Sequence, residues 1–269
     1  MAALPQHLQV DWVIPGKPTD PTVLAFTGFG HRLDPWRRLR VPGWRVGVIE
    51  FPVGTPPSQV WTPAAMTARL APHWSQAACR VLMSFSFGAA GATALTRELS
   101  EAEPAGHIIA PKPQLAIHIA PVQWARIPWP VLRRVPLSMR LPALKQVAKG
   151  GGALMAMAGR SGGHSIREFV QLVDRHVGWE FVAFYLPYLD WIDGTKTTLA
   201  TWDQAPWPNH LFGASDDRVI PVKGMRAQQS LLGTTVFHET SGMHFNAVDA
   251  ARPHITTLLT ELLEAQPTT

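Results

Sequence analysis

The sequence has one cysteine, Cys79, among its 269 residues. A single thiol cannot form an internal disulfide, and it makes a zinc site built on cysteines implausible. Charged residues are also scarce, at 16% of the chain, and the formal net charge is +5. Such a small basic excess points only weakly to an anionic partner, and we expect no nucleic-acid partner.

A long uninterrupted apolar run is also missing. The longest apolar stretch, residues 181–192, contains Pro187 and Asp190 and is too short to cross a bilayer, so we expect no stable membrane insertion. The first 13 residues have neither a basic start nor an unbroken apolar stretch, unlike a secretory signal. We therefore expect a cytoplasmic protein.

Short apolar runs that favour strands recur along the chain, and helical segments alternate with several of them. The predicted strands are Val23–Phe26, Val46–Phe51, Arg80–Phe85, Leu115–Ala120, His210–Gly213 and Thr234–Glu239. The predicted helices are Pro63–Ala78, Phe87–Leu99 and Ala247–Glu264. This alternation predicts an α/β fold with a mostly parallel central sheet flanked by helices.

Residues 121–208 differ in kind from the rest of the chain. Prolines cluster there, glycines break the pattern at 150–152 and 162–163, and helical segments are predicted near 165–177 and 181–191. A mostly helical insertion fits this composition better than more sheet. We predict a core of residues 1–120 and 209–269, with residues 121–208 inserted as a helical lid or cap.

Ser86 lies between a predicted strand and a helix rich in alanine and glycine, and Gly88 follows two residues later. A nucleophile elbow needs this arrangement, because its serine occupies a strained turn where strand and helix pack closely. Ser84 stands where the usual G-x-S-x-G motif has its first glycine, and serine is small enough to be tolerated there. The alternative is that Ser86 simply caps a helix.

A glycine turn, Gly28-Phe29-Gly30, ends the first of these predicted strands. Acyl transfer needs two backbone donors aimed at the developing oxyanion, and we predict the N–H groups of Phe29 and Phe87 for this role. Gly28 and His31 are expected to line the substrate. An ordinary tight turn is the alternative, whereas a dinucleotide site is excluded because the third glycine of G-x-G-x-x-G is missing.

An acid and a base follow later strands. The predicted base is His244, with His238 second because it lies inside a strand. The predicted acid is Asp217, with Asp216 as second choice. Serine, aspartate and histidine in this order form a complete set for acyl transfer, although a turn aspartate is often a cap and a lone histidine is often structural. The other histidines show no metal-ligand spacing, so we predict no metal and no cofactor.

The elbow, the glycine turn and the D-R-V-I-P and G-M-H segments resemble the α/β-hydrolase superfamily, particularly lidded serine esterases similar to pimeloyl-ACP methyl ester esterases. In that family a His-Gly-aromatic-Gly turn supplies one oxyanion donor, and Thr27 replaces the histidine here. The family's elbow serine corresponds to Ser86 and its final histidine to His244. Its acid corresponds to Asp217 by the D-R-V-I-P run, or to Asp216 by counting from Gly213.

The predicted function is a serine hydrolase that cleaves a carboxylic ester through an acyl-enzyme. A thioesterase, lactonase or amidase would use the same triad, and a non-catalytic binding protein with this fold is the alternative from another class. A haloalkane dehalogenase would need an aspartate at position 86.

The insertion also has a basic stretch. A docking site for an anionic carrier is one hypothesis, and a solvated helix face is the simpler one; the residues are Arg133, Arg134, Arg140, Lys145 and Lys149.

Overall fold

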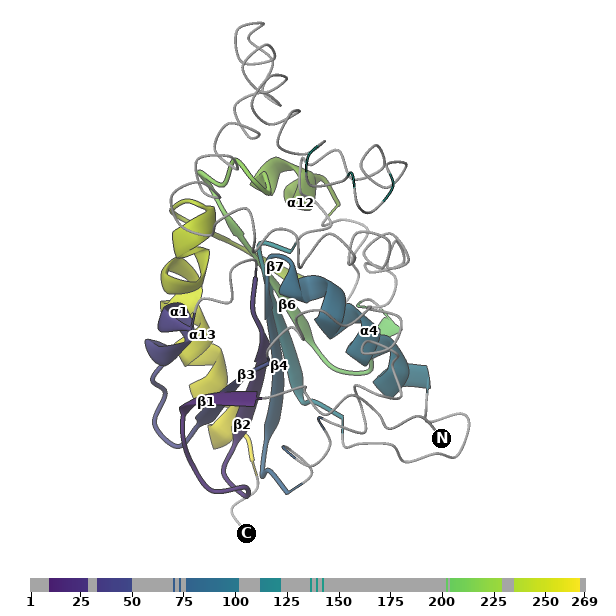
Figure 1. The fold of residues 1–269 in the computed structure, drawn as a ribbon. Helices are drawn as coiled ribbons and strands as arrows, with labels where there is room; N and C mark the ends of the chain where they lie inside the picture. Colours follow the sequence, from purple (N-terminus) through teal and green to yellow (C-terminus); the bar gives the residue numbers. More distant parts are fainter. Residues whose placement is uncertain are drawn as a thin grey trace, which may run out of the picture.

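A seven-stranded sheet with the order β1-β3-β2-β4-β5-β6-β7 forms the centre of the protein (Figure 1). The structure is a computed structural model, and it describes residues 10–28, 33–49, 76–101, 112–121, 204–228 and 235–266 and the single positions 70, 73, 136, 139, 142 and 202. The strands are β1 (Val10–Ile14), β2 (Thr22–Phe26), β3 (Arg45–Ile49), β4 (Arg80–Phe85), β5 (Leu115–Ile119), β6 (Asn209–Ala214) and β7 (Thr235–Thr240).

Six strands are parallel, and β1 pairs with β3 in the antiparallel direction. The six parallel strands are the predicted ones, with ends that differ by a few residues. The strand β1 was not predicted. It is a partly buried edge strand, so it does not show the continuous apolar run that strands covered on both faces show.

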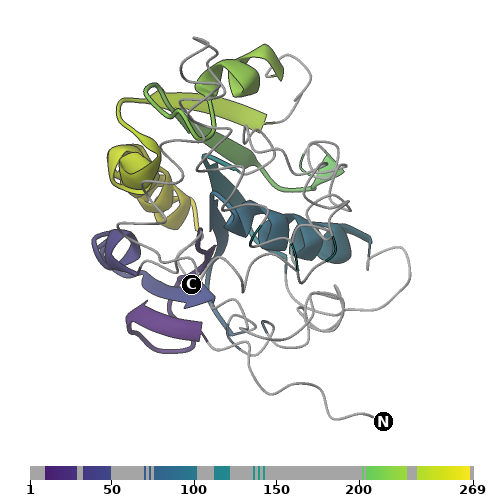
Figure 2. The same cartoon turned by 45° about the horizontal axis from the view of Figure 1, so that its top comes forward.

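Helices cover both faces of the sheet. The helices α1 (Asp34–Arg37) and α13 (Ala247–Glu264) lie on one face, and α4 (Gly88–Glu101) lies on the other (Figures 1 and 2). A shorter helix, α12 (Val222–Gln228), contacts β6. The fold class predicted from the alternation of strands and helices is therefore confirmed.

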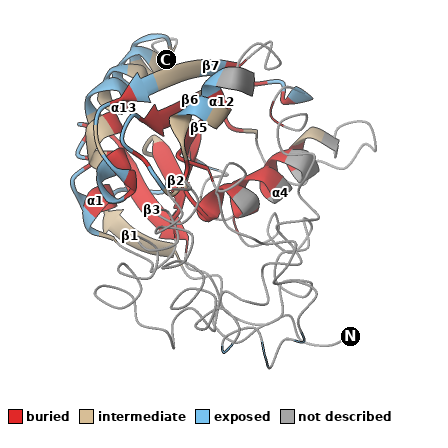
Figure 3. Cartoon of the chain, turned by 90° about the horizontal axis from the view of Figure 1, so that it is seen from above, coloured by how far each residue is buried: buried red, intermediate tan, exposed pale blue. Residues whose placement is uncertain are grey.

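Burial follows this layering. All residues of β2, β3 and β5 are buried, whereas β1 is partly buried and β7 has two exposed residues (Figure 3). On the face covered by α13, side chains of the central strands such as Val23 and Val81 pack with Ile255 and Leu259. Burial on both faces explains why the central strands show runs of apolar residues instead of alternation.

Parallel strands bring their carboxyl ends to one edge of the sheet, and functional residues of open α/β sheets gather there. Ser86 follows β4, Asp217 follows β6 and His244 follows β7. The topology therefore collects three residues that are far apart in the sequence.

Several predictions concern residues outside the described part of the chain. They are most of the helix 63–78, most of the proposed cap, the oxyanion residue Phe29, the lining residue His31 and the basic residues Arg133, Arg134, Arg140, Lys145 and Lys149. Of the proposed cap, the structure describes 121, 136, 139, 142, 202 and 204–208. Among the described helices, none has both the length and the apolar character needed to span a membrane.

Candidate active site

Ser86 occupies a strained turn between β4 and α4. Its φ angle is 51°, in the left-handed region that residues with a side chain rarely adopt. Its backbone N–H donates to the carbonyl of Ile119 at 2.9 Å, and its own carbonyl accepts from the N–H of Ala89 at 3.1 Å. Bonds on both sides of the turn therefore hold Ser86 in this conformation.

Gly88 makes this turn possible. A Cβ atom at position 88 would lie 2.2 Å from the carbonyl oxygen of Phe26 and 2.6 Å from that of Thr27. These are backbone atoms at the end of β2, and they cannot move away as the end of a flexible side chain could. The glycine two residues after Ser86 is thus required by close contact between the start of α4 and the neighbouring strand.

A continuous chain of hydrogen bonds joins the three predicted residues. The Oγ atom of Ser86 lies 3.0 Å from Nε2 of His244, and Nδ1 of His244 lies 2.7 Å from Oδ2 of Asp217. All three residues are buried, with 6% or less of their surface exposed. This is the geometry that a Ser-His-Asp acyl-transfer site needs.

The carboxylate of Asp217 is held in place on its other side. Its Oδ1 atom accepts the backbone N–H groups of Val219 at 2.9 Å and Ile220 at 2.7 Å. Asp216 is exposed, and its backbone N–H donates to the carbonyl of Gly242. The structure therefore brings Asp217, and not Asp216, to His244.

The glycine turn lies directly beside Ser86. A Cβ atom at Gly28 would be 3.0 Å from Cβ of Ser86 and 2.8 Å from the ring of Phe85. Phe87, the predicted second oxyanion residue, is 1% exposed at the start of the elbow helix. Thr27, which replaces the family's histidine, is buried, and its Oγ1 atom lies 3.4 Å from Nε1 of Trp36. The turn that leads to Phe29 therefore begins in contact with the nucleophile.

Apolar side chains surround the imidazole of His244. The ring of Phe85 is 5.1 Å from it and tilted by 31°, and the ring of Phe245 is 5.6 Å away at 87°. Phe245 and Met243 are 36% and 64% exposed. The imidazole thus packs between the partly buried ring of Phe85 and the exposed ring of Phe245, and Met243 precedes it in the chain.

Sequence reasoning missed a second serine–histidine contact below the elbow. The Oγ atom of Ser84 lies 2.8 Å from Nδ1 of His118, and both side chains are fully buried. Burial lowers the pKa of His118 to about 3, so this imidazole is neutral. Ser84 in place of the usual glycine was the available signal, but its partner could be identified only from the pairing of β4 with β5.

His238, the second-choice base, lies away from Ser86. Its Nε2 atom is 2.8 Å from Nδ1 of His210, on the sheet face that α13 covers. Burial, and to a lesser extent His238, lower the pKa of His210 to about 4, and burial and His254 lower the pKa of His238. Within the described ranges, no three His, Cys, Asp or Glu side chains converge as a metal site requires.

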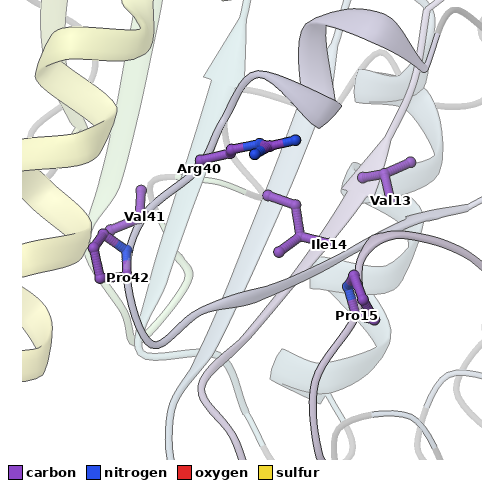
Figure 4. Close-up of a pocket in the computed structure, with 6 residues that line it drawn as sticks. All are labelled: Val13, Ile14, Pro15, Arg40, Val41 and Pro42. Carbon is purple, nitrogen blue, oxygen red and sulfur yellow. The ribbon is translucent and has the colours of Figure 1, made fainter.

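A hollow of about 410 Å³ lies at the other end of the sheet (Figure 4). Its lining residues are Val13, Ile14, Pro15, Arg40, Val41 and Pro42. Ile14 pairs with Val46 near the start of β3, whereas Ser86 follows the end of the parallel strand β4. This hollow is therefore separate from the triad.

No family model matches the chain, and no curated protein matches it in sequence. Solved structures do match. A thermophilic esterase from Thermogutta terrifontis is 18% identical, with a TM-score of 0.57 and coverage of 93% of this chain and 92% of that one. An α/β-hydrolase fold protein from Nakamurella multipartita is also 18% identical, with a TM-score of 0.51 and coverage of 94% and 95%.

The thioesterase domain from the curacin biosynthetic pathway is 16% identical, with a TM-score of 0.52 and coverage of 91% and 92%. Likeness at this level of identity defines the fold and leaves the reaction open. The chain has the α/β-hydrolase fold.

Proposed function

We propose that this protein is a serine hydrolase that cleaves a carboxylic ester through an acyl-enzyme on Ser86. The observation that carries the proposal is the continuous hydrogen-bonded chain from Ser86 through His244 to Asp217. Each member follows a different strand, yet all three side chains meet at one edge of the sheet. A helix cap or an isolated structural histidine would not need the other two members.

In the first step His244 acts as general base. Asp217 accepts the N–H of Nδ1, which leaves the lone pair of Nε2 directed at the hydroxyl of Ser86. The Ser86 proton moves to Nε2 as its oxygen attacks the ester carbonyl. The resulting imidazolium lies beside a carboxylate that two backbone N–H groups fix in orientation.

The tetrahedral intermediate places a negative charge on the former carbonyl oxygen. We assign its stabilisation to the backbone N–H groups of Phe87, which follows the nucleophile, and Phe29, which follows Gly28. The contact of Gly28 with Ser86 supports this assignment. Each such donor contributes about 3 kcal/mol to transition-state stabilisation.

Collapse of the intermediate breaks the bond to the alcohol, which leaves with the proton held on Nε2 of His244. Water then attacks the acyl-enzyme, with the same nitrogen as base, and a second collapse releases the acid and restores the Ser86 hydroxyl. No other reactant is needed for this cycle.

The substrate class follows from the surroundings of His244. The apolar residues Phe85, Phe245 and Met243 favour an uncharged acyl or alcohol group close to the reacting bond. An esterase and a thioesterase both occur among the structural neighbours, and both reactions use this triad. We propose an ester as substrate, and a thioester, lactone or amide as the alternatives.

Residues 121–208 connect β5 to β6 in the chain, and they begin directly after β5, which ends at the same edge of the sheet as β4. We propose that they form a cap whose apolar side chains supply the acyl pocket and exclude water. We also propose that Arg133 and Arg134 of this cap dock an anionic carrier. If replacing both arginines with glutamate leaves the turnover of acyl-carrier esters unchanged, the carrier proposal is wrong.

A fluorophosphonate probe tests the nucleophile directly, because it forms a covalent bond only with an activated serine. We expect one equivalent of label on the wild-type chain and none on Ser86→Ala. Ser215→Ala is a matched control, because Ser215 is an exposed serine at the same edge of the sheet. An unlabelled wild type, or labelling that survives Ser86→Ala, would refute the proposal.

A panel of p-nitrophenyl esters of increasing acyl length, with matched thioesters, tests the bond and the pocket. An esterase should turn over the oxygen esters, and a cap pocket should make the apparent KM depend on acyl length. Turnover of the thioesters alone would assign the protein to the alternative reaction.

A further inference from the structure

The hydroxyl of Ser84 has a defined partner, although nucleophile elbows usually have glycine at this position. Ser84 and His118 are paired neighbours in the parallel strands β4 and β5, and their side chains lie on the same face of the sheet. Their Oγ and Nδ1 atoms are 2.8 Å apart, and neither residue is exposed. Ser84 therefore does more than fill the space of a glycine.

Asn209 lies close enough to His118 to influence its imidazole. The Nε2 atom of His118 and the Oδ1 atom of Asn209 are both buried, and among the described residues neither has a hydrogen-bond partner. Burial lowers the pKa of His118, and the nearby Asn209 side chain raises it to a lesser extent. The imidazole is therefore neutral, and its one side-chain hydrogen bond within the described part of the chain joins Nδ1 to the Ser84 hydroxyl.

Asn209 also holds the segment that returns from the insertion. Its Nδ2 atom donates to the carbonyls of Trp202 at 2.8 Å and Trp207 at 3.1 Å. The indole of Trp202 also stacks on the His118 ring, with centroids 3.8 Å apart and planes at 9°. The Ser84–His118 hydrogen bond and the stacking of Trp202 on His118 therefore join Trp202 to the strand that leads to Ser86, and Asn209 holds Trp202 and Trp207 on the neighbouring strand.

We propose that Ser84, His118 and Asn209 are positioning residues that hold the return segment, Trp202 and residues 204–208, against the nucleophile strand. The proposal rests on the proposed function of Ser86 and of the insertion as a cap. Because the return segment is the root of the insertion on its carboxyl side, its placement sets the acyl pocket relative to Ser86. The serine at position 84 is then the residue that connects the elbow to the cap.

Loss of the Ser84 hydroxyl would leave a buried nitrogen without its hydrogen bond. Leaving one buried polar group unsatisfied corresponds to about a tenfold change or more in a local equilibrium. The expected effect of Ser84→Ala is therefore a loosened return segment in a protein that still folds. Ser84→Thr keeps the hydroxyl and should restore the wild-type behaviour, and Ser84→Gly is a second way to remove it.

Thr93→Val is the matched control. Thr93 is a buried residue of α4 whose hydroxyl donates to the carbonyl of Ala89 at 2.7 Å, within the same helix. The change removes one buried hydroxyl, as Ser84→Ala does, without touching the network. It separates loss of stability from loss of positioning.

Hydrogen exchange followed by mass spectrometry tests the anchoring. We expect exchange in peptides covering residues 202–208 to rise about tenfold in Ser84→Ala and to stay unchanged in Thr93→Val. Equal exchange in this segment in the two variants would overturn the inference.

Kinetics on the ester panel test the effect on the reaction. We expect Ser84→Ala to raise KM for long acyl chains about tenfold, with less than about a threefold change in kcat for the acetyl ester or in the rate of fluorophosphonate labelling. The same increase in KM for short and long esters would show that the network has only a structural role. Failure of Ser84→Thr to restore the wild-type KM would show the same. A wild type that the probe does not label would instead overturn the proposed function, and this inference with it.

Discussion

His118 should make the folding stability of this protein depend on pH. Its imidazole is fully buried, and its pKa falls from 6.5 to about 3, chiefly because burial disfavours the charged form. A histidine whose pKa is lower in the folded state binds its proton preferentially when unfolded. Its contribution to stability is therefore fully present above pH 6.5 and is lost as the pH falls from 6.5 towards 3.

The size of this loss follows from linkage. One pKa unit corresponds to about 1.4 kcal/mol, so between pH 8 and pH 5 the free energy of unfolding should fall by about 2 kcal/mol on account of His118 alone. This figure is insensitive to the folded pKa, because at pH 5 the folded histidine stays neutral for any pKa well below 5. His210 and His238, whose pKa values are also lowered, add to the loss in the wild type.

The assay compares wild type, His118→Asn and Ser84→Ala by urea denaturation at pH 8 and pH 5. His118→Asn removes the titrating group, so its loss of stability between the two pH values should be about 2 kcal/mol smaller than that of the wild type. Ser84→Ala keeps the buried imidazole and should keep the full loss, whatever its stability at pH 8. Parallel pH profiles for the wild type and His118→Asn would refute the reasoning.

Three further predictions follow from the geometry. Asp217→Asn should lower kcat by roughly 10⁴-fold, because it disturbs the tautomer of the base, whereas Asp216→Asn should change kcat by less than about threefold. Steady-state kinetics of both variants on one ester measure this, and equal losses of kcat would contradict the choice of Asp217. Gly88→Ala should destabilise the fold by about 1–3 kcal/mol or more in denaturant titrations, since its Cβ meets fixed backbone; a change within error would show that the elbow tolerates a side chain. Arg38→Ala should leave the thermal midpoint of unfolding almost unchanged, because the Arg38 guanidinium is exposed, although it pairs with Asp249 through two contacts of 2.9 and 2.6 Å. A large fall in the thermal midpoint that persists in high salt would contradict this prediction.

The parallel strands and the terminal helix were accessible from the sequence because they depend on local patterns. The strands covered on both faces show apolar runs, and the predicted helix 247–264 has the observed bounds. The antiparallel β1 was missed because a partly buried edge strand lacks such a run. Its place in the sheet depends on pairing with β3, which no local pattern specifies.

The chemistry of the triad was also accessible from the sequence. Ser86, Asp217 and His244 each follow a strand, and parallel strands end at one edge of the sheet, so order along the chain implied proximity. The choice between Asp216 and Asp217 was not settled this way. Adjacent residues in a turn point in different directions, and only the folded turn shows which carboxylate reaches the histidine.

The sequence by itself therefore determined the fold class and singled out Ser86 and His244 as the proposed nucleophile and base, because helix and strand periodicity and turn residues are encoded locally. The tertiary structure decided which aspartate serves His244, why Gly88 cannot carry a side chain, and what Ser84 contacts. Each of these depends on atoms from strands that are distant in the chain. Their contact is set by strand order and register, which become defined only when the sheet forms.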